Sequence, residues 1–228
     1  MLSIVIPTYN ERDNVKRLIP SIFSVLEKSG IKGEVIIVDD DSPDGTGRLA
    51  DSLSEKYPVR VIHRPSKSGL SSAVIEGLKK ARGDKLIVMD ADFSHPPGKI
   101  PEMFQALNLH DLVVGSRYVK GGGIENWPTK RKITSQIAIL LAKPLFKTSD
   151  PVSGFFGLKR KVLPDNLHAR GYKIGLEIGV KGRYNSLTEI PYIFSNRKKG
   201  KSKLNNKEIF NYLIQLLALY YYKLRKIF

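Results

Sequence analysis

The stretch EVIIVDDDSPDGTGRLA, residues 34–50, contains the pattern of one strand, one turn and the start of one helix. Its four consecutive apolar residues, 35–38, predict a short strand that is buried on both faces, as in a parallel sheet covered by helices. Residues 42–45 predict a turn, and Asp44 or Thr46 is expected to cap the helix that follows. A strand that leads through a turn into a helix is the building unit of α/β folds.

The same alternation extends over the first half of the chain. Strands are expected at 3–6, 34–39, 59–63, 86–90 and 112–115, and helices at 12–28, 46–56, 69–81 and 99–107. This order predicts a doubly wound, mostly parallel sheet whose ligands bind at the carboxyl ends of the strands. A chain of 228 residues is long enough to form one such domain.

The second half is less regular. It contains a glycine-rich loop (120–128), a helix (129–143), a basic loop (197–203) and a final helix (207–228) that is rich in Leu and Tyr. The apolar run of this last helix is shorter than the roughly 18–20 residues that cross a bilayer. We expect it either to lie in a membrane interface or to pack on the domain.

The distribution of charge differs sharply between the halves. Residues 1–116 contain 15 Lys and Arg against 16 Asp and Glu, whereas residues 117–228 contain 23 against 6, a net charge of +17. This surplus predicts an anionic partner: nucleic acid, a phosphorylated ligand or an anionic membrane face. The chain has no cysteine, which excludes disulfides and thiolate metal sites. No secretory signal precedes the first strand, so a cytoplasmic location is expected.

Two carboxylates follow the fourth expected strand in the stretch VMDADFSHPPG, residues 88–98. Asp90 and Asp92 are two residues apart, so on a strand both would point the same way. Two like charges at that distance repel one another unless a cation lies between them. Because carboxylate oxygens suit hard divalent ions, the pair predicts a site for Mg²⁺ or Mn²⁺.

Residues 45–50 formally fit the glycine pattern of dinucleotide-binding folds. Four aspartates come immediately before it, where a pyrophosphate would have to lie, and their charge argues against that role. These aspartates are better suited to accept hydrogen bonds from a nucleotide's base or ribose.

Several basic residues of the second half could bind a phosphate group. Arg131 and Ser135 are four residues apart on the expected helix and therefore share a face. Arg117 lies in the turn that follows the fifth strand, and Arg197 and Lys203 flank the basic, glycine-containing loop. Arginine supplies forked donors and lysine a point charge, so together they would form a phosphate clamp if the fold brings them together.

Taken in order, these segments resemble the inverting family-2 glycosyltransferases of the GT-A fold, and among them the dolichyl-phosphate mannose synthases. Nine segments carry the resemblance over nearly the whole chain: IPTYNE (6–11), VDDDSPDGT (38–46), GLSSAVIEG (69–77), MDADFSHPP (89–97), GSRYVKGGG (115–123), NWPTKRKITS (126–135), DPVSGFF (150–156), GYKIGLEI (171–178) and RKKGKSKL (197–204). The resemblance implies a single Rossmann-like GT-A catalytic domain over residues 1–204, with a donor and metal half (1–116) and an acceptor half (117–204). An amphipathic helix would follow over residues 205–228.

The resemblance also implies roles for individual residues. The donor nucleotide would be bound by Pro7, Tyr9, Glu11, Val38, Asp40, Asp90, Ala91, Asp92, Arg117, Lys173, Arg197 and Lys203, with Asp39 nearby. The metal would be held by Asp90, Asp92 and Ser94. The acceptor phosphate would be bound by Arg117, Arg131, Ser135, Arg197 and Lys203. Asp92, Arg117, Arg131 and Ser135 are the implied catalytic residues.

The implied reaction transfers mannose from GDP-mannose to dolichyl or another polyprenyl phosphate with inversion. Its products are GDP and dolichyl β-D-mannosyl phosphate, for protein glycosylation or glycolipid synthesis. The implied partners are an anionic membrane surface, at whose cytoplasmic face the chain would bind peripherally, and a membrane-anchoring subunit.

Three alternatives remain at the level of sequence. One is a polyprenyl-phosphate glycosyltransferase that uses another donor, such as UDP-glucose. Another is an inactive scaffold subunit. The third is a basic nucleic-acid-binding module, which leaves the pair Asp90 and Asp92 unexplained, so no nucleic-acid partner is expected.

Overall fold

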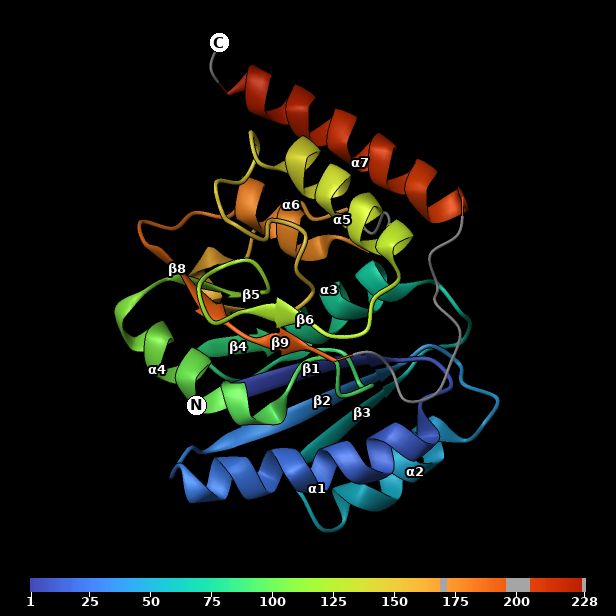
Figure 1. The fold of residues 1–228 in the computed structure, drawn as a ribbon. Coiled ribbons are helices and arrows are strands. Elements are labelled where there is room, and N and C mark those ends of the chain that lie inside the picture. Colours follow the sequence, from blue (N-terminus) through green and yellow to red (C-terminus); the bar gives the residue numbers. More distant parts are fainter. Residues whose placement is uncertain (169–171, 196–205, 227–228) are drawn as a thin grey trace.

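A seven-stranded sheet forms the centre of the molecule, and helices cover both of its faces (Figure 1). The computed structural model describes residues 1–168, 172–195 and 206–226. In spatial order the strands are β3 (Val59–His63), β2 (Gly33–Asp39), β1 (Leu2–Thr8), β4 (Lys85–Val88), β7 (Phe156–Lys159), β5 (Leu112–Ser116) and β8 (Leu187–Pro191). Neighbouring strands are parallel except at β7, which is antiparallel to both β4 and β5. The expected mostly parallel α/β fold is confirmed.

Each face of the sheet has its own helical layer. One layer contains α1 (Arg12–Lys28), α2 (Thr46–Ser54) and α4 (Ile100–Leu109), and the other contains α3 (Leu70–Lys80), α5 (Thr129–Ala142) and α6 (Ile174–Lys181). The long helix α7 (Asn206–Arg225) lies outside the second layer, beside α5 (Figure 1). Short elements complete the fold: the strand pair β6 (Gly123–Ile124) and β9 (Ile193–Phe194), and the 3₁₀ turns η1 (Pro97–Lys99) and η2 (Arg160–Val162).

The stretch quoted at the outset folds as expected. β2 ends at Asp39, the chain turns, and α2 begins at Thr46. Gly45 precedes the helix with a φ of +80°, a conformation that costs glycine little. The carboxylate of Asp44 accepts hydrogen bonds from the backbone N–H (2.9 Å) and the hydroxyl (2.6 Å) of Thr46, which satisfies a donor at the helix start.

The final helix packs on the domain. Leu216 and Leu219 are buried, and the hydroxyls of Tyr212 and Tyr220 donate to carbonyls of α5 at 2.6 and 2.8 Å. One side of α7 therefore packs on the domain, which is one of the two expected placements. No helix in the described part of the chain combines the length and apolar composition needed to cross a bilayer.

Candidate active site

Two acidic side chains lie just past the carboxyl end of β4. This strand ends at Val88, so the expectation that it runs to residue 90 is wrong. Asp90 and Asp92 belong instead to a turn in which Phe93 has a left-handed φ of +62°. Asp92 is buried, and its Oδ1 accepts hydrogen bonds from the backbone N–H (3.1 Å) and hydroxyl (2.6 Å) of Ser94. Asp90 and Asp92 are therefore positioned by a turn with internal hydrogen bonds, and not by the alternation of side chains along a strand.

A buried histidine supports this turn. The Nδ1 atom of His95 accepts the backbone N–H of Asp90 at 2.9 Å, and its ring stacks on Phe155 with centroids 5.0 Å apart. Burial lowers the pKa of His95, so the ring is neutral and carries its proton on Nε2. His95 thus fixes the backbone at Asp90. In the sequence it is one polar residue beside two prolines, with no signal of this role.

The donor atoms of the turn suit a hard divalent cation. Asp90 and Asp92 offer carboxylate oxygens and Ser94 a hydroxyl oxygen, which are ligand types of Mg²⁺ and Mn²⁺. Within residues 1–168, 172–195 and 206–226, no group of three or more His, Cys, Asp or Glu side chains could hold a metal alone. Two carboxylates are sufficient where substrate phosphates complete the coordination, as is usual for Mg²⁺. The residues therefore fit a cation shared with a bound diphosphate.

The guanidinium of Arg117 is paired inside the protein. Its Nε and Nη2 donate to the two carboxylate oxygens of Asp150 at 2.6 and 2.7 Å, and only 7% and 0% of the two side chains are exposed. Burial disfavours the charged guanidinium, but the hydrogen bonds and charge of Asp150 prevail and raise the pKa of Arg117. Arg117 was expected to face the phosphates. Two of its three nitrogens, Nε and Nη2, donate to Asp150 instead, and only Nη1 lies outside this bidentate pair.

The arginine of α5 lies over an aromatic ring. The Cζ atom of Arg131 is 4.1 Å from the ring centre of Trp127, and that of Arg117 is 5.4 Å from the same ring. One turn further along α5, the hydroxyl of Ser135 is 3.2 Å from that of Tyr118. Arg117, Arg131 and Ser135, which are far apart in the sequence, are thus brought to one region.

Lys173 connects this region to the acidic turn. Its Nζ donates to the carbonyl of Val152 at 3.0 Å. Burial, together with the positive charges of Arg117 and Arg131, lowers the pKa of Lys173 to about 8, while the charges of Asp150 and Asp90 act in the opposite sense. Lys173 therefore lies within electrostatic reach of both the acidic turn and the basic residues.

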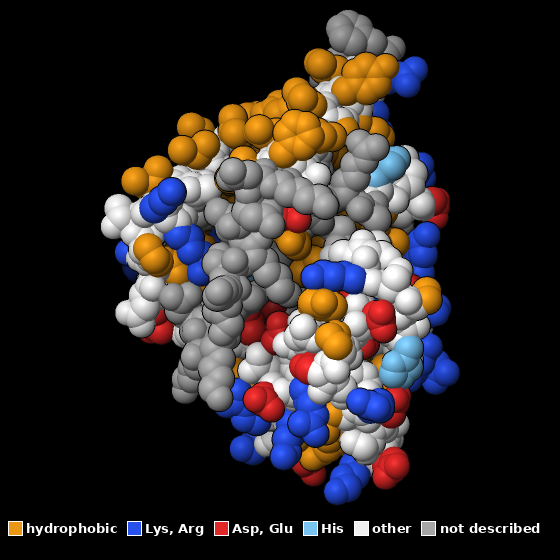
Figure 2. Space-filling model, turned by 90° about the vertical axis from the view of Figure 1, so that its right-hand side faces the viewer, with side chains coloured by type: hydrophobic (Ala, Val, Ile, Leu, Met, Phe, Trp, Pro, Cys, Tyr) orange, Lys and Arg blue, Asp and Glu red, His pale blue; other side chains and the backbone are white. Residues whose placement is uncertain are grey.

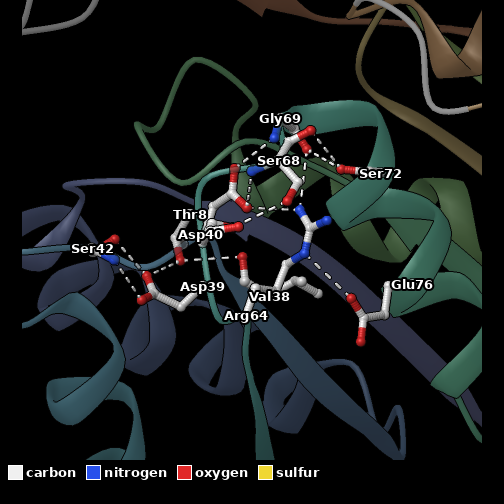
Figure 3. A network of polar contacts seen from close by, with 11 residues as sticks. Thr8, Val38, Asp39, Asp40, Ser42, Arg64, Ser68, Gly69, Ser72 and Glu76 are labelled. Carbon is white, nitrogen blue, oxygen red and sulfur yellow. Dashed lines mark hydrogen bonds and ion pairs between the residues drawn. The ribbon is translucent and has the colours of Figure 1, made fainter.

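A polar network surrounds Asp40 at the carboxyl end of β2 (Figure 3). Its Oδ1 accepts hydrogen bonds from Arg64 Nη1 (2.7 Å) and the N–H of Ser68 (3.0 Å), and its Oδ2 accepts from the N–H of Gly69 (2.8 Å). Asp40 thus ties the loop before α3 to the end of β2. Each carboxylate oxygen has two lone pairs, so Oδ2 keeps one acceptor position for a ligand.

The other proposed nucleotide-binding residues lie along the same edge of the sheet. Pro7 and Val38 are in β1 and β2, Tyr9 and Glu11 follow β1, and Ala91 is buried between the two acidic residues. The Tyr9 ring has the ammonium of Lys67 3.7 Å from its centre. Asp39 accepts hydrogen bonds from the hydroxyls of Thr8 (2.9 Å) and Ser42 (2.6 Å), so it holds the strand ends together.

Two proposed site residues, Arg197 and Lys203, lie outside the described residues together with the expected basic loop. Asp150 and Trp127 were not identified individually as site residues. Their segments appear only within the matching motifs, because a lone Asp before a Pro and a lone Trp in a loop carry no local pattern.

The fold and the strand-end carboxylates define a class of enzyme. The model of glycosyl transferase family 2 matches residues 3–167, and the chain belongs to this family. It is 48% identical over 224 residues to a dolichol-phosphate mannosyltransferase of Pyrococcus furiosus, an alignment covering 96% of this chain and 63% of that protein. The chain therefore spans less than two thirds of this relative. A dolichol-phosphate mannosyltransferase of Saccharomyces cerevisiae is 40% identical over 233 residues, covering 97% of this chain and 87% of that protein.

Solved structures share the fold at low sequence identity. A glucosyl-3-phosphoglycerate synthase of Mycobacterium tuberculosis, in complex with Mg²⁺ and UDP, superposes with a TM-score of 0.68 at 19% identity over 98% of this chain and 79% of that one. A mannosyltransferase of Pyrobaculum calidifontis, in complex with GDP-Man and Mn²⁺, gives 0.65 at 16% identity over 95% and 64%. The expected GT-A fold is confirmed.

Proposed function

We propose that this chain transfers mannose from GDP-mannose to dolichyl or another polyprenyl phosphate, giving GDP and the β-D-mannosyl phosphate of the lipid. The names of its relatives support this assignment. One structural observation carries it. The ring of Phe194 lies 5.7 Å from Cζ of Arg131 and 6.2 Å from the ring of His95, to which the N–H of Asp90 donates. Carboxylates suited to a metal-bound donor and cations suited to a phosphate acceptor therefore lie in one site.

The arrangement accounts for the chemistry of a phosphate acceptor. A phosphate monoester is anionic at neutral pH and attacks without losing a proton, so no general base is needed. Lys173 and Arg131 offset the repulsion between the two anions and orient them. A divalent cation held by Asp90, Asp92 and Ser94 would offset the charge that develops on the leaving diphosphate. As the phosphate oxygen bonds to the anomeric carbon, the bond to GDP breaks on the opposite side, which inverts α to β.

The assignment is tested by incubating the purified chain with radiolabelled GDP-mannose or UDP-glucose, a polyprenyl phosphate and Mn²⁺ or Mg²⁺. We expect label to pass from GDP-mannose into the lipid fraction as a β-linked product. Preference for UDP-glucose would favour the alternative donor. A folded protein that transfers no sugar from either donor would refute the proposal.

The affinity for GDP-mannose should fall about tenfold between pH 7 and pH 9. Lys173, with a pKa of about 8, is protonated below that pH and binds the diphosphate as a cation, whereas above it the charge is lost. The diphosphate diester of GDP-mannose does not titrate in this range. Calorimetry at fixed metal concentration measures the profile, and Lys173→Arg, whose guanidinium stays charged, should flatten it. An equal dependence of affinity on pH in both proteins would argue against a contact between Lys173 and the diphosphate of GDP-mannose.

Helices α5 and α7 together present an apolar face to solvent. Its most exposed members are Ile133, Ile137 and Leu140 on α5, and Phe210, Leu217, Tyr221 and Leu224 on α7, each between 52% and 71% exposed. Figure 2 shows hydrophobic side chains gathered along the upper edge of the molecule, where Figure 1 places these helices. The same two helices and the residues just after them also carry exposed basic side chains: Lys130, Lys132, Lys143, Arg225 and Lys226. Apolar surface accompanied by cations suits the interface of an anionic membrane.

We therefore propose that the apolar face binds the lipid membrane in which a polyprenyl phosphate resides, on its cytoplasmic side. α5 carries Arg131 as well as apolar residues of this face, so membrane binding would place the acceptor-binding helix at the height of the lipid headgroups. A membrane-anchoring subunit is the alternative occupant of the face.

Replacing Phe210 and Leu217 together by Glu should reduce binding to phosphatidylglycerol vesicles at least tenfold, because two inserted apolar side chains are lost. Vesicle flotation measures the bound fraction. Leu109→Glu is the matched control, since Leu109 is 79% exposed on α4, on the other side of the sheet. Unchanged flotation of the double variant, or an equal loss in the control, would contradict membrane binding by this face and favour a protein partner.

A further inference from the structure

Trp127 is the single tryptophan of the chain and lies immediately before α5. Only 8% of the residue is exposed, and its indole Nε1–H has no hydrogen-bond acceptor among the residues that the structure describes. Native structures rarely leave a buried donor unsatisfied, because it has lost its hydrogen bonds to water. Such a group in a binding region indicates an acceptor that arrives with a ligand.

The surroundings of the ring restrict what this acceptor can be. Arg131 lies over the ring face at 4.1 Å, Arg117 is 5.4 Å away, and Phe194 meets the ring edge-on at 5.2 Å. None of these three side chains carries an acceptor atom. The carboxylate of Asp150 already accepts from Arg117 on both oxygens. A group that offers oxygen acceptors next to a guanidinium is most stable when it is anionic.

We propose that the indole N–H of Trp127 donates a hydrogen bond to the phosphate of the lipid acceptor, beside the guanidinium of Arg131. This inference rests on the proposed function and adds a neutral donor to the proposed acceptor site. Since Arg131 is 4.1 Å from the ring, one phosphate can accept from both side chains at ordinary distances of about 2.9 Å. Trp127 is thus a substrate-binding residue rather than only a packing residue.

Because the chain has one tryptophan, its indole N–H gives a single resonance in a ¹H–¹⁵N spectrum. We expect this resonance to move downfield when ¹⁵N-labelled protein is titrated with citronellyl phosphate, a short soluble isoprenyl phosphate. Citronellol, which lacks the phosphate, should leave it in place. Phe194→Leu, which alters the packing of the ring but keeps the N–H, should retain the response. A resonance that does not move at saturating citronellyl phosphate, or that moves equally with citronellol, overturns the inference.

A kinetic test uses Trp127→Phe, which keeps an aromatic ring under Arg131 and removes the N–H. The KM for the acceptor should rise about 10- to 100-fold, while the affinity for GDP-mannose changes less than twofold. An unchanged acceptor KM would refute the hydrogen bond. The spectrum also separates the two proposals: a resonance that responds to citronellyl phosphate in a protein that transfers no mannose supports the phosphate contact and refutes only the assigned reaction.

Discussion

Asp92→Asn should lower the rate of the proposed mannosyl transfer at least about 10³-fold and leave the protein folded. The expected loss follows from charge. Asp92 is buried beside Asp90, and without its negative charge the site loses one of two carboxylates proposed to hold the metal and, through it, the leaving diphosphate. The asparagine oxygen can still accept both hydrogen bonds from Ser94, so the turn itself is preserved.

Comparison with Asp92→Ala separates the charge from the turn. The alanine variant loses the bonds to Ser94 as well, so it should be destabilised by about 1 kcal/mol relative to Asp92→Asn, with no less loss of transfer. Transfer assays, thermal unfolding and calorimetry of Mn²⁺-dependent GDP binding measure these effects. If Asp92→Asn kept more than a tenth of the activity, or if chelators left the wild-type rate unchanged, Asp92 would have no role through a metal.

The first half of the fold could be predicted because its elements carry local signals. In α1 the residues Val15, Leu18, Ile22 and Leu26 follow helical spacing and all are buried, and the expected bounds of this helix agree with the structure. The strand expected at 86–90 was predicted to end two residues too late. Its apolar character continues through Met89, which is buried although β4 has already ended. The N–H of Met89 also still donates to the carbonyl of Val5 in β1 at 3.1 Å, so contact with the sheet extends one residue beyond the end of β4.

The second half was only partly predictable. The helices α5 and α7 were expected, but β7, β8 and α6 were not. β7 is four residues long and contains Gly157, whose backbone fits tightly between Leu107 and Ile87. Its place in the sheet is determined by antiparallel pairing with β4 and β5, which are distant in the sequence. No property of the segment itself distinguishes it from a loop.

The charge asymmetry predicted an anionic partner, but it could not indicate which cations of the second half are already paired. Arg117 is engaged by Asp150, and Lys181 by Glu177 at 2.6 Å. Such pairs depend on the tertiary fold. A count of charges therefore overestimates the number of cations that are available to a phosphate.

Asp150→Ala should destabilise the protein by about 3–5 kcal/mol, because it leaves the buried guanidinium of Arg117 without a counter-charge. The variant also removes an acceptor for the backbone N–H of Arg117. Urea unfolding followed by circular dichroism measures the loss. The matched comparison is the double variant Arg117→Met with Asp150→Leu, which removes both charges and fills the space with apolar atoms.

The double variant should be more stable than Asp150→Ala, since a buried pair costs little when both partners are replaced and much when one remains. Equal midpoints for the two variants would show that the destabilisation comes from the cavity at position 150 and not from an unpaired charge. If the pair behaves as expected, Asp150 holds Arg117 in place, and the guanidinium of Arg117 then supports the ring of Trp127, whose centre is 5.4 Å from its Cζ atom. Lys173 and Arg131 are the described cations proposed to contact the phosphates. Arg131→Glu should therefore weaken substrate binding without the loss of stability expected for Asp150→Ala.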